Sequence, residues 1–530
     1  MYDYLLTNGL IVDGSRAKPR RANLAIRGGV IAAITEDTPA AAQVLDVSGL
    51  AVAPGFIDIH SHSDASPLVG YPVESKLAQG VTTEIAGNCG ISLLPSVAEH
   101  ADEVQDYFAS ELELPLNGRR IVYRSMPDYA AAVQQNGTRI NVGMLVGHGT
   151  LRLSAMGFVN RAPTAQELAC MEQLLDEELS RGAFGLSLGL IYPPSAFGTT
   201  EELTALARVV KAHGAILAVH MRSEGPHIFE AVDEVLSIAE RTGVHLQISH
   251  LKLLGRAQWG RSEQLLARID AARSRGAHVT CDQYPYTASS TALTALMPHW
   301  SHAGGSEAML RRLQSREGTL CADIEREMHD RGGSETILIT STHGYHPEYE
   351  GRYVSELAEQ FGLSAVDTVI RLLLECRVSV ACVYFCIAQE DMLRIMSRCD
   401  VCVGSDGYSF SYDPAHMQIS PHPRSFATFP QFFQTVREHA LLPLEDAVYK
   451  VSALPAEILG LHDRGRLAEG MAADITVFDP ARIASRSTFL CPKVRPQGVE
   501  HVFVAGKLAY SGEIACELCA GTVLLHRAGQ

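Results

Sequence analysis

The feature that most constrains this chain is a series of short apolar runs, each of which ends in a residue that can bind a metal ion. The segments PGFIDIHSH, IAGNCG, ILAVH, LQISH and VGSD contain the following residues at their ends: His60 and His62, Cys89, His220, His250, and Asp406. In a barrel of parallel strands, the loops after the strands converge on one mouth, where the chemistry lies. We therefore expect these side chains to meet at one barrel mouth.

Strand and helix patterns alternate between these positions, as βαβ units do. Segments such as AQELACMEQLLDEELSRG and EELTALARVVKAHG carry apolar residues at helical spacing and end in Gly. The expected strands are residues 51–60, 81–89, 140–148, 182–192, 215–220, 245–250, 278–286 and 401–406. The sequence predicts an α/β fold with a (β/α)₈ TIM-like barrel over residues 51–461.

Both ends of the chain have a different sequence pattern from the barrel region. Residues 1–50 and 462–530 contain short strand patterns punctuated by Gly and Asp, as in YLLTNGLIVDG and GVEHVFVAGKLAYSGE. Neither end alone would bury much core, so we expect both to pair in one small β-sandwich domain. The long stretch between the last two barrel strands, about 287–395, is predicted to be an insertion that acts as a lid.

Composition excludes several classes of function. The net charge is −16 and there is no Lys/Arg run, which argues against a nucleic-acid partner. We expect no signal peptide, and the longest apolar region (366–388) is interrupted by charged residues, unlike a membrane span. The twelve cysteines do not suggest a disulfide framework, and the pairs Cys399/Cys402 and Cys516/Cys519 are expected to be structural or incidental. We expect a cytoplasmic protein with a small-molecule substrate and no membrane partner; the sequence does not indicate its oligomeric state.

The His-x-His pair is the strongest sign of a metal site. Because side chains alternate along a strand, His60 and His62 point to the same face. A single strand-end histidine, such as His220 or His250, is more often structural, and Asp406 after Gly-Ser could be a turn residue. At successive strand ends, however, His, Cys and carboxylate together match the ligands that zinc prefers. Five ligand positions can hold one metal or two.

Cys89 has two interpretations. A cysteine next to Gly at a strand end is commonly a small buried apolar residue. A thiolate can also bridge two cations, a role that a carboxylated lysine at the end of the fourth strand often fills. The fourth strand here, GLSLGLIY, has no lysine. We therefore predict that Cys89 is the bridging ligand.

The chain resembles the D-aminoacylase (N-acyl-D-amino-acid deacylase) group of the amidohydrolase superfamily. The matching segments span nearly the whole chain: PGFIDIHSHSD, GVTTEIAGNCGIS, GLIYPPSAFGTTEEL, HMRSEG, ISHLK, DQYPYTASST, GSDG, HPRSFATFP and GRLAEGMAADITVFDP. The resemblance implies zinc-dependent hydrolysis of N-acyl-D-amino acids to a D-amino acid and a carboxylate. It also implies a tightly held zinc at Cys89, His220 and His250, and a weaker second site at the following residues: His60, His62, Cys89 and Asp406.

Asp406 is the expected catalytic residue, because its carboxylate can take a proton from water and pass it to the leaving amine. Lys252, two residues after His250, is expected to bind the substrate's α-carboxylate, and the alternative is a solvated loop lysine. The resemblance also gives Lys252 this role, with Tyr192 and a tyrosine of the YPY segment (Tyr284 or Tyr286) as helpers, and packing is the alternative role for these tyrosines. Ser289 and Arg424 are further candidates for contact with the substrate. An acidic substrate side chain would need a further cation. The sequence does not identify one, so a neutral D-amino acid is expected.

Two other functions remain open at this stage. The first is a hydrolase of cyclic amides, like hydantoinase or dihydroorotase; the missing fourth-strand lysine, the NCG segment and the long insertion argue against it. The second is a non-catalytic scaffold on the same fold, but such proteins typically lose their ligands and this chain keeps them. The preference for D over L substrates rests on the resemblance alone.

Overall fold

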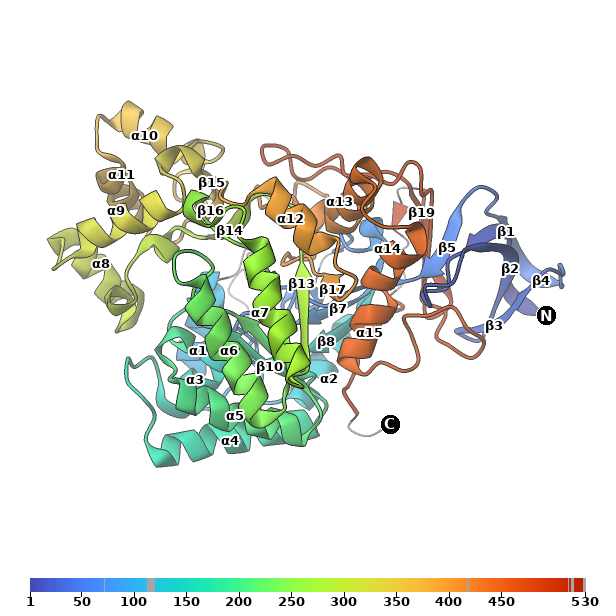
Figure 1. Cartoon of the computed structure of the whole chain (residues 1–530), viewed down its shortest axis with the longest axis horizontal. Coiled ribbons are helices and arrows are strands. Elements are labelled where there is room, and N and C mark those ends of the chain that lie inside the picture. The colour runs from blue at the N-terminus through green and yellow to red at the C-terminus, as the bar shows by residue number, and fades with distance from the viewer. Residues whose placement is uncertain (71, 112–119, 417–418, 513, 516–518, 528–530) are drawn as a thin grey trace.

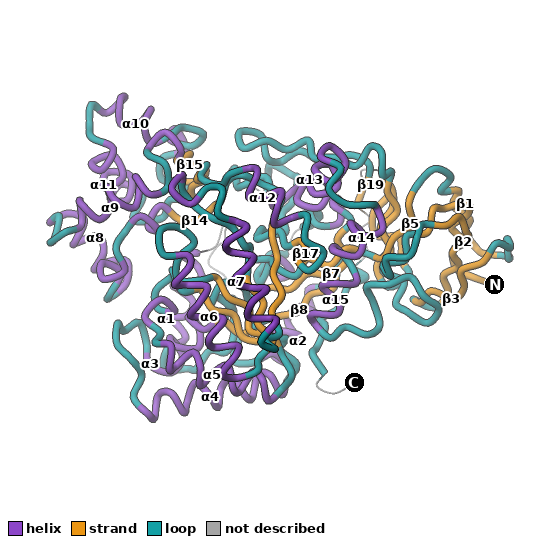
Figure 2. Tube along the Cα trace, viewed as in Figure 1, coloured by secondary structure: helices purple, strands orange, loops and turns teal. Residues whose placement is uncertain are grey.

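The computed structural model describes residues 1–70, 72–111, 120–416, 419–512, 514–515 and 519–527. A central barrel separates a sheet at one end of the molecule, which contains the N-terminus, from a helical lobe at the other end (Figure 1). Strands gather in the terminal sheet and in the barrel, and helices surround the barrel strands (Figure 2). Among the described residues, no helix is long and apolar enough to cross a membrane.

The barrel strands pair only in parallel, in two groups. One is β6 (Phe56–Asp58), β7 (Val81–Ala86) and β8 (Asn141–Met144); the other is β9 (Val146–Gly147), β10 (Gly185–Gly189), β11 (Ile216–His220), β12 (His245–Ile248), β13 (Val279–Gln283) and β17 (Val401–Val403). β8 and β9 are two halves of the predicted third strand and join the two groups, because β8 pairs with β7 and β9 with β10. A parallel bridge between Ser61 and Gly407 closes the ring. The eight predicted barrel strands are therefore all present.

Amphipathic helices cover the barrel, as the alternating pattern predicts. They are α1 (Ala101–Glu111), α2 (Met126–Asn136), α3 (His148–Met156), α4 (Ala165–Ser180), α5 (Thr200–Ala212), α6 (Ile228–Thr242), α7 (Ser262–Ser274), α12 (Gln389–Met396), α13 (Arg424–His439), α14 (Leu444–Val451) and α15 (Ala453–Leu459). α4 begins with a reciprocal cap between Thr164 and Glu167, and α6 ends at Gly243 in the left-handed conformation. Leu206 of α5, Val232 of α6 and Leu217 of β11 share one core cluster, which positions the strand ends rigidly.

Strands from both chain ends form one nine-stranded sheet. From the N-terminal part come β1 (Tyr2–Ile11), β2 (Arg20–Arg27), β3 (Val30–Thr35), β4 (Ala41–Asp46) and β5 (Ala51–Pro54); from the C-terminal part come β18 (Ile475–Phe478), β19 (Val499–Val504), β20 (Lys507–Ser511) and β21 (Ile514–Ala515). β5 joins the two parts, because it pairs with β1 and with β18. Leu24, Val477 and Phe503 lie in the shared core.

Two expected boundaries differ from the structure. The predicted strand 51–60 is split at Gly55, so that its first half belongs to the terminal sheet and only its second half to the barrel. A Cβ at Gly55 would lie 2.1 Å from the Thr82 hydroxyl, so the chain passes too close to β7 for a side chain. The second difference is at the C-terminal end, where residues 462–530 were expected to belong to the terminal domain. The amides of Leu524 and His526 instead donate hydrogen bonds to the carbonyls of Val142 and Gly182 in the barrel. Cys516, in one predicted pair, lies outside the described residues.

The insertion forms the helical lobe. It consists of β14 (Ser289–Ala292), α8 (Gly305–Ser315), α9 (Leu320–Asp330), β15 (Ile337–Ser341), α10 (Val354–Phe361), α11 (Ala365–Glu375) and β16 (Ala381–Tyr384), and its strands pair antiparallel in the order β14–β16–β15. α12, which falls inside the predicted insertion, instead packs against α7 on the barrel, where Asp391 accepts bonds from the backbone of Gly260 and Ser262.

Candidate active site

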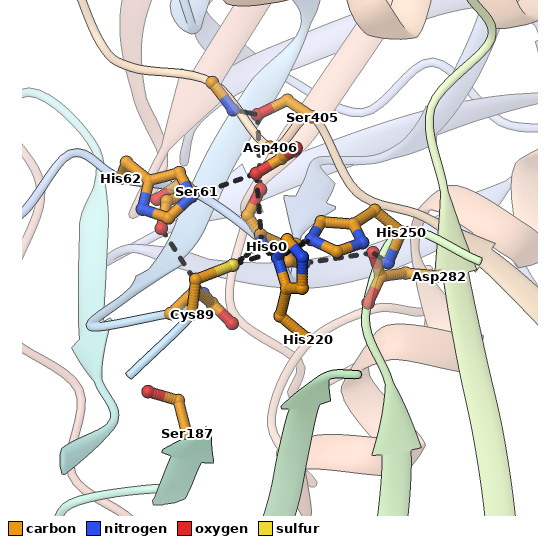
Figure 3. A network of polar contacts seen from close by, with 12 residues as sticks. His60, Ser61, His62, Cys89, Ser187, His220, His250, Asp282, Ser405 and Asp406 are labelled. Atoms are coloured by element: carbon orange, nitrogen blue, oxygen red, sulfur yellow. Dashed lines mark hydrogen bonds and ion pairs between the residues drawn. The ribbon is translucent and has the colours of Figure 1, made fainter. Parts of the chain in front are cut away.

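The six predicted ligand residues converge at the carboxyl ends of the barrel strands (Figure 3). The Cys89 sulfur lies 3.4 Å from His60 Nε2 and 3.6 Å from His250 Nε2. Asp406 Oδ1 lies 3.3 Å from His60 Nε2 and 2.9 Å from His62 Nε2. The nitrogens His220 Nδ1 and His250 Nε2 are 2.9 Å apart. Residues from five strand ends thus face one point.

The electrostatics keep the site's anionic groups charged. Burial raises the pKa of the Cys89 thiol, but the charge of His60 and hydrogen bonds from the surrounding imidazoles outweigh it and hold the pKa well below its ordinary value. Burial likewise raises the pKa of Asp406, and the neighbouring charges, Arg424 foremost, bring it well below the usual range. Cys89, His250 and Asp406 all have positive φ, a strained conformation that is common at functional sites.

Asp282 at the end of β13 contacts two of the predicted ligands, and it was not among the residues predicted from the sequence. Its Oδ1 lies 3.1 Å from His60 Nδ1 and accepts a 2.8 Å bond from the His250 amide. Its Oδ2 accepts a 2.8 Å bond from the Gln247 amide group. A carboxylate behind a ligand histidine fixes the ring's orientation and tautomer. The signal was available, because Asp282 opens the quoted DQYPY segment at a strand end.

Ser187, on the fourth barrel strand, supports the loop that carries Cys89. Its hydroxyl donates to the Gly87 carbonyl and accepts from the Gly90 amide. Gly189, two residues further on, leaves room for the same loop, since a Cβ there would lie 1.9 Å from the Cys89 carbonyl oxygen. The small residues of the fourth-strand segment GLSLG therefore have a structural role, because they let the loop that carries Cys89 pack against this strand.

Glu224 is a second residue that the sequence analysis missed, although the quoted HMRSEG segment contains it. Its Oε1 accepts a 2.6 Å bond from Lys252 Nζ and lies 3.0 Å from His250 Nδ1. Burial raises the pKa of Glu224, and the Lys252 charge and the two imidazoles lower it far more. Lys252 is therefore a buried, paired cation beside the ligands and not a solvated loop lysine.

A cavity of about 1350 Å³ opens from the ligands toward the insertion. Five of the six predicted substrate-binding residues line it: Tyr192, Lys252, Tyr284, Ser289 and Arg424. The Tyr284 hydroxyl is buried without a hydrogen-bond partner, whereas Arg424 pairs with Asp406 Oδ2 at 2.6 Å. Tyr286 is not among the lining residues, because its ring packs against His422 and Phe489. This placement disagrees with the expected role of Tyr286.

A buried Ser-His-Glu arrangement lies beneath the Cys89 loop. The Ser195 hydroxyl is 2.8 Å from His148 Nδ1, and His148 Nε2 is 2.9 Å from Glu202, which also pairs with Arg152. These groups resemble a nucleophilic triad. All four are fully or almost fully buried and none lines the cavity, so we assign them a structural role: Ser195 accepts a bond from the Gly189 amide and so supports β10.

The donor set fits a divalent cation. Two groups of ligand atoms each lie within 4.8 Å of one another: His60, Cys89, His250 and Asp406, and His220, Glu224 and His250. Nitrogen and thiolate donors of this kind are the ones that zinc prefers. In addition, His220 Nε2 is buried and has no hydrogen-bond partner among the described residues, as expected of a nitrogen that is kept for a metal.

Known proteins share both the sequence and the fold. The amidohydrolase family matches residues 51–509. D-aminoacylase from Alcaligenes xylosoxydans xylosoxydans is 37% identical over 99% of this chain and 98% of its own length. N-acyl-D-glutamate deacylase from the same organism is 37% identical over 95% and 93%. A crystal structure of N-acyl-D-glutamate deacylase from Bordetella bronchiseptica, with zinc and a phosphonate mimic of the tetrahedral intermediate, superposes with a TM-score of 0.82 at 34% identity, covering 99% of both chains. The chain therefore belongs to the amidohydrolase family, with the D-aminoacylase and the N-acyl-D-amino-acid deacylases as its relatives.

Proposed function

We propose that this protein hydrolyses the amide bond of N-acyl-D-amino acids, yielding a D-amino acid and a carboxylate, with zinc as its metal. The observation that carries the proposal is the Cys89 thiol between His60 and His250 at a barrel mouth, in a chain that matches D-aminoacylase over nearly its full length. A thiol in this position distinguishes the site from one built around a fourth-strand lysine. This difference argues against a cyclic-amide hydrolase.

Cys89, His220 and His250 are the proposed ligands of a tightly held zinc. A weaker second site would use the following residues: His60, His62, Cys89 and Asp406. Zinc supplies Lewis acidity toward the scissile carbonyl and the attacking water. The low pKa of Cys89 supports the assignment, since only the thiolate is a good metal ligand.

Asp406 is the proposed general base and acid. It lines the cavity, and its Oδ2 is held by Arg424 while Oδ1 faces His60 and His62. Ionised and fixed in this way, its carboxylate can accept a proton from water and deliver it to the leaving nitrogen. Arg424 is thus proposed to position the catalytic carboxylate.

Lys252 and Tyr284 are proposed to bind the substrate's α-carboxylate. Both line the cavity, Lys252 Nζ lies 5.7 Å from the centre of the Tyr284 ring, and the Tyr284 hydroxyl is free to donate. Tyr192, whose hydroxyl lies 3.2 Å from that of Thr291, and Ser289 are proposed to contact the rest of the substrate. Because β14 and the helices after it contribute to the cavity wall, we also propose that the insertion closes over bound substrate.

The free thiols of the described cysteines support a cytoplasmic location.

The test is a hydrolysis panel on the zinc-loaded protein, with N-acetyl-D- and N-acetyl-L-amino acids and with hydantoin and dihydroorotate as cyclic controls. Turnover confined to the D series, and abolished in Asp406→Asn, is the expected result. Turnover of the cyclic amides or of L substrates alone would refute the proposal. Zinc measured by elemental analysis in the same samples tests the stoichiometry.

A further inference from the structure

One arginine on the cavity wall, Arg331, has no carboxylate partner among the residues that the structure describes. Six lysine and arginine side chains line the cavity: Arg222, Lys252, Arg326, Arg331, Arg377 and Arg424. Five of them pair with carboxylates at 2.5–3.1 Å, namely with Glu234, Glu224, Asp323, Glu307 and Asp406 in the same order. Within the part of the chain that the structure describes, Arg331 alone of the six has no carboxylate oxygen within 4.0 Å.

The surroundings of Arg331 hold its guanidinium in place without forming an ion pair. Burial lowers the pKa of Arg331, and the charges of nearby groups, Glu327 of α9 among them, raise it more, but no carboxylate oxygen of the described residues lies within 4.0 Å. The residue follows α9 of the insertion, and its guanidinium carbon lies 4.9 Å from the centre of the Tyr384 ring in β16. Its Nε is buried and has no hydrogen-bond partner. Stacking on an aromatic ring leaves the planar fork of N–H donors open to an incoming ligand.

Arg331 is placed near the substrate-binding residues already described. The Cys386 sulfur lies 3.8 Å from the Ser289 hydroxyl, and burial raises the pKa of this thiol while Arg331 and Lys252 both lower it. Both cations line the same cavity, and the charges of both act on Cys386. Lys252 is already paired with Glu224, so the two cations are not equivalent.

A guanidinium that is partly withdrawn from water and left unpaired is costly, and proteins retain such groups where a ligand supplies the opposite charge. The fork geometry matches a carboxylate, which it can bind through two parallel hydrogen bonds. The α-carboxylate of the proposed substrate is already assigned to Lys252 and Tyr284. A carboxylate at Arg331 must then be a second one on the same molecule.

We infer that Arg331 binds a second carboxylate of the substrate, so that the preferred substrates are N-acyl-D-amino acids with two carboxylates. This inference rests on the proposed function and narrows its substrate class. The second carboxylate comes either from an acidic amino-acid side chain or from a dicarboxylic acyl group. An acidic side chain would replace the expectation of a neutral one, which depended only on the lack of an identified cation, whereas a dicarboxylic acyl group is compatible with a neutral side chain. Arg331 is the cation that the sequence did not identify, because it lies in the insertion and outside the sequence motifs of the site.

The experiment compares pairs of substrates that differ by one charge, on zinc-loaded wild-type protein and on Arg331→Met. N-acetyl-D-glutamate against N-acetyl-D-glutamine tests the side chain, and N-succinyl-D-alanine against N-butyryl-D-alanine tests the acyl group. We expect the wild type to favour the acidic member of one pair by about 10- to 100-fold in kcat/KM, and Arg331→Met to abolish that ratio. Arg326→Met is the matched control, because Arg326 lines the same cavity but pairs with Asp323; its ratio should equal that of the wild type.

Calorimetric titration with the same four compounds, on Asp406→Asn and on the Asp406→Asn/Arg331→Met double variant, gives a readout that does not depend on turnover. Selective binding of one acidic compound that disappears with Arg331 supports the inference. Equal rates and equal affinities for the charged and neutral members of both pairs overturn it, while turnover of the neutral compounds leaves the deacylase proposal intact. If none of the four is hydrolysed by the wild type, the proposed function fails, and absence of charge-selective binding then overturns the inference as well. If Arg331→Met does not fold, Arg331→Gln, which also removes the charge, takes its place with the same expected result.

Discussion

Replacing Glu202 with Gln should destabilise the barrel strongly without touching the cavity. Both Glu202 oxygens accept bonds of 2.6–2.7 Å from Arg152, which is fully buried and donates one further bond, to the Arg161 carbonyl. In Glu202→Gln the volume is kept, but the Arg152 charge loses its compensation inside the protein. Breaking one partner of a buried ion pair costs about 3–5 kcal/mol. For a chain of this length, that corresponds to a decrease in Tm of about 3–5 °C.

The same contacts make the stabilisation by Glu202 depend on pH. Burial raises the pKa of Glu202, and its bonds to His148 and Arg152 lower it more, to about 2. Because the folded-state pKa lies below the unfolded value of about 4.5, the stabilisation is fully present above pH 4.5 and is lost as the pH falls toward 2. We expect the stability difference between wild type and Glu202→Gln to shrink by about 2 kcal/mol from pH 5 to pH 3.

Urea and thermal unfolding of the zinc-loaded proteins, followed by circular dichroism, measure both effects. The double variant Arg152→Met/Glu202→Gln is the control, because it removes the charge along with its partner and should recover at least half of the loss. A loss below about 1 kcal/mol in Glu202→Gln, or a double variant as unstable as the single one, would refute the reasoning that Arg152 depends on Glu202 to compensate its buried charge.

Four further substitutions test the site. Asp406→Asn should lower kcat about 10³-fold while at least one zinc per chain remains, as measured by steady-state kinetics and elemental analysis; unchanged kcat would exclude it as the proton acceptor. Cys89→Ala should lose most bound zinc, and full zinc content with full activity would refute the bridging assignment. Asp282→Asn should weaken zinc binding by about 10- to 100-fold in competition with a chelator, because His60 loses its carboxylate partner; wild-type affinity would contradict this. Gly189→Ala should cost about 100-fold or more in kcat/KM with an unchanged circular dichroism spectrum, because its methyl group would displace the Cys89 carbonyl; wild-type activity would mean that the loop tolerates the shift.

Much of the fold was predictable because its signals are local. Apolar runs at strand length, helical periodicity and Gly stops depend on neighbours within a few residues, and the expected barrel strands are all found. Boundaries were less predictable. The division of residues 51–60 at Gly55 depends on the distance from the chain to Thr82 in another strand, which no local pattern encodes.

The site divides in the same way. The convergence of His60, Cys89 and Asp406 could be predicted from the sequence. All three follow strands, and parallel strands bring their carboxyl ends to one barrel mouth. The supporting residues were not. Asp282 and Glu224 act through contacts with histidines that are 222 and 26 positions away, respectively.

The sequence by itself thus determined the metal-binding chemistry and the architecture that gathers it. Only the tertiary structure decided which carboxylates orient the ligands, why Tyr284 rather than Tyr286 reaches the cavity, and that Arg331 faces it unpaired. The physical reason is that residue type and periodicity are properties of the local chain. Pairing and burial of charge depend instead on which distant segments are packed together. Here the insertion supplies part of the cavity wall, including Arg331, the one arginine of that wall without a carboxylate partner among the described residues.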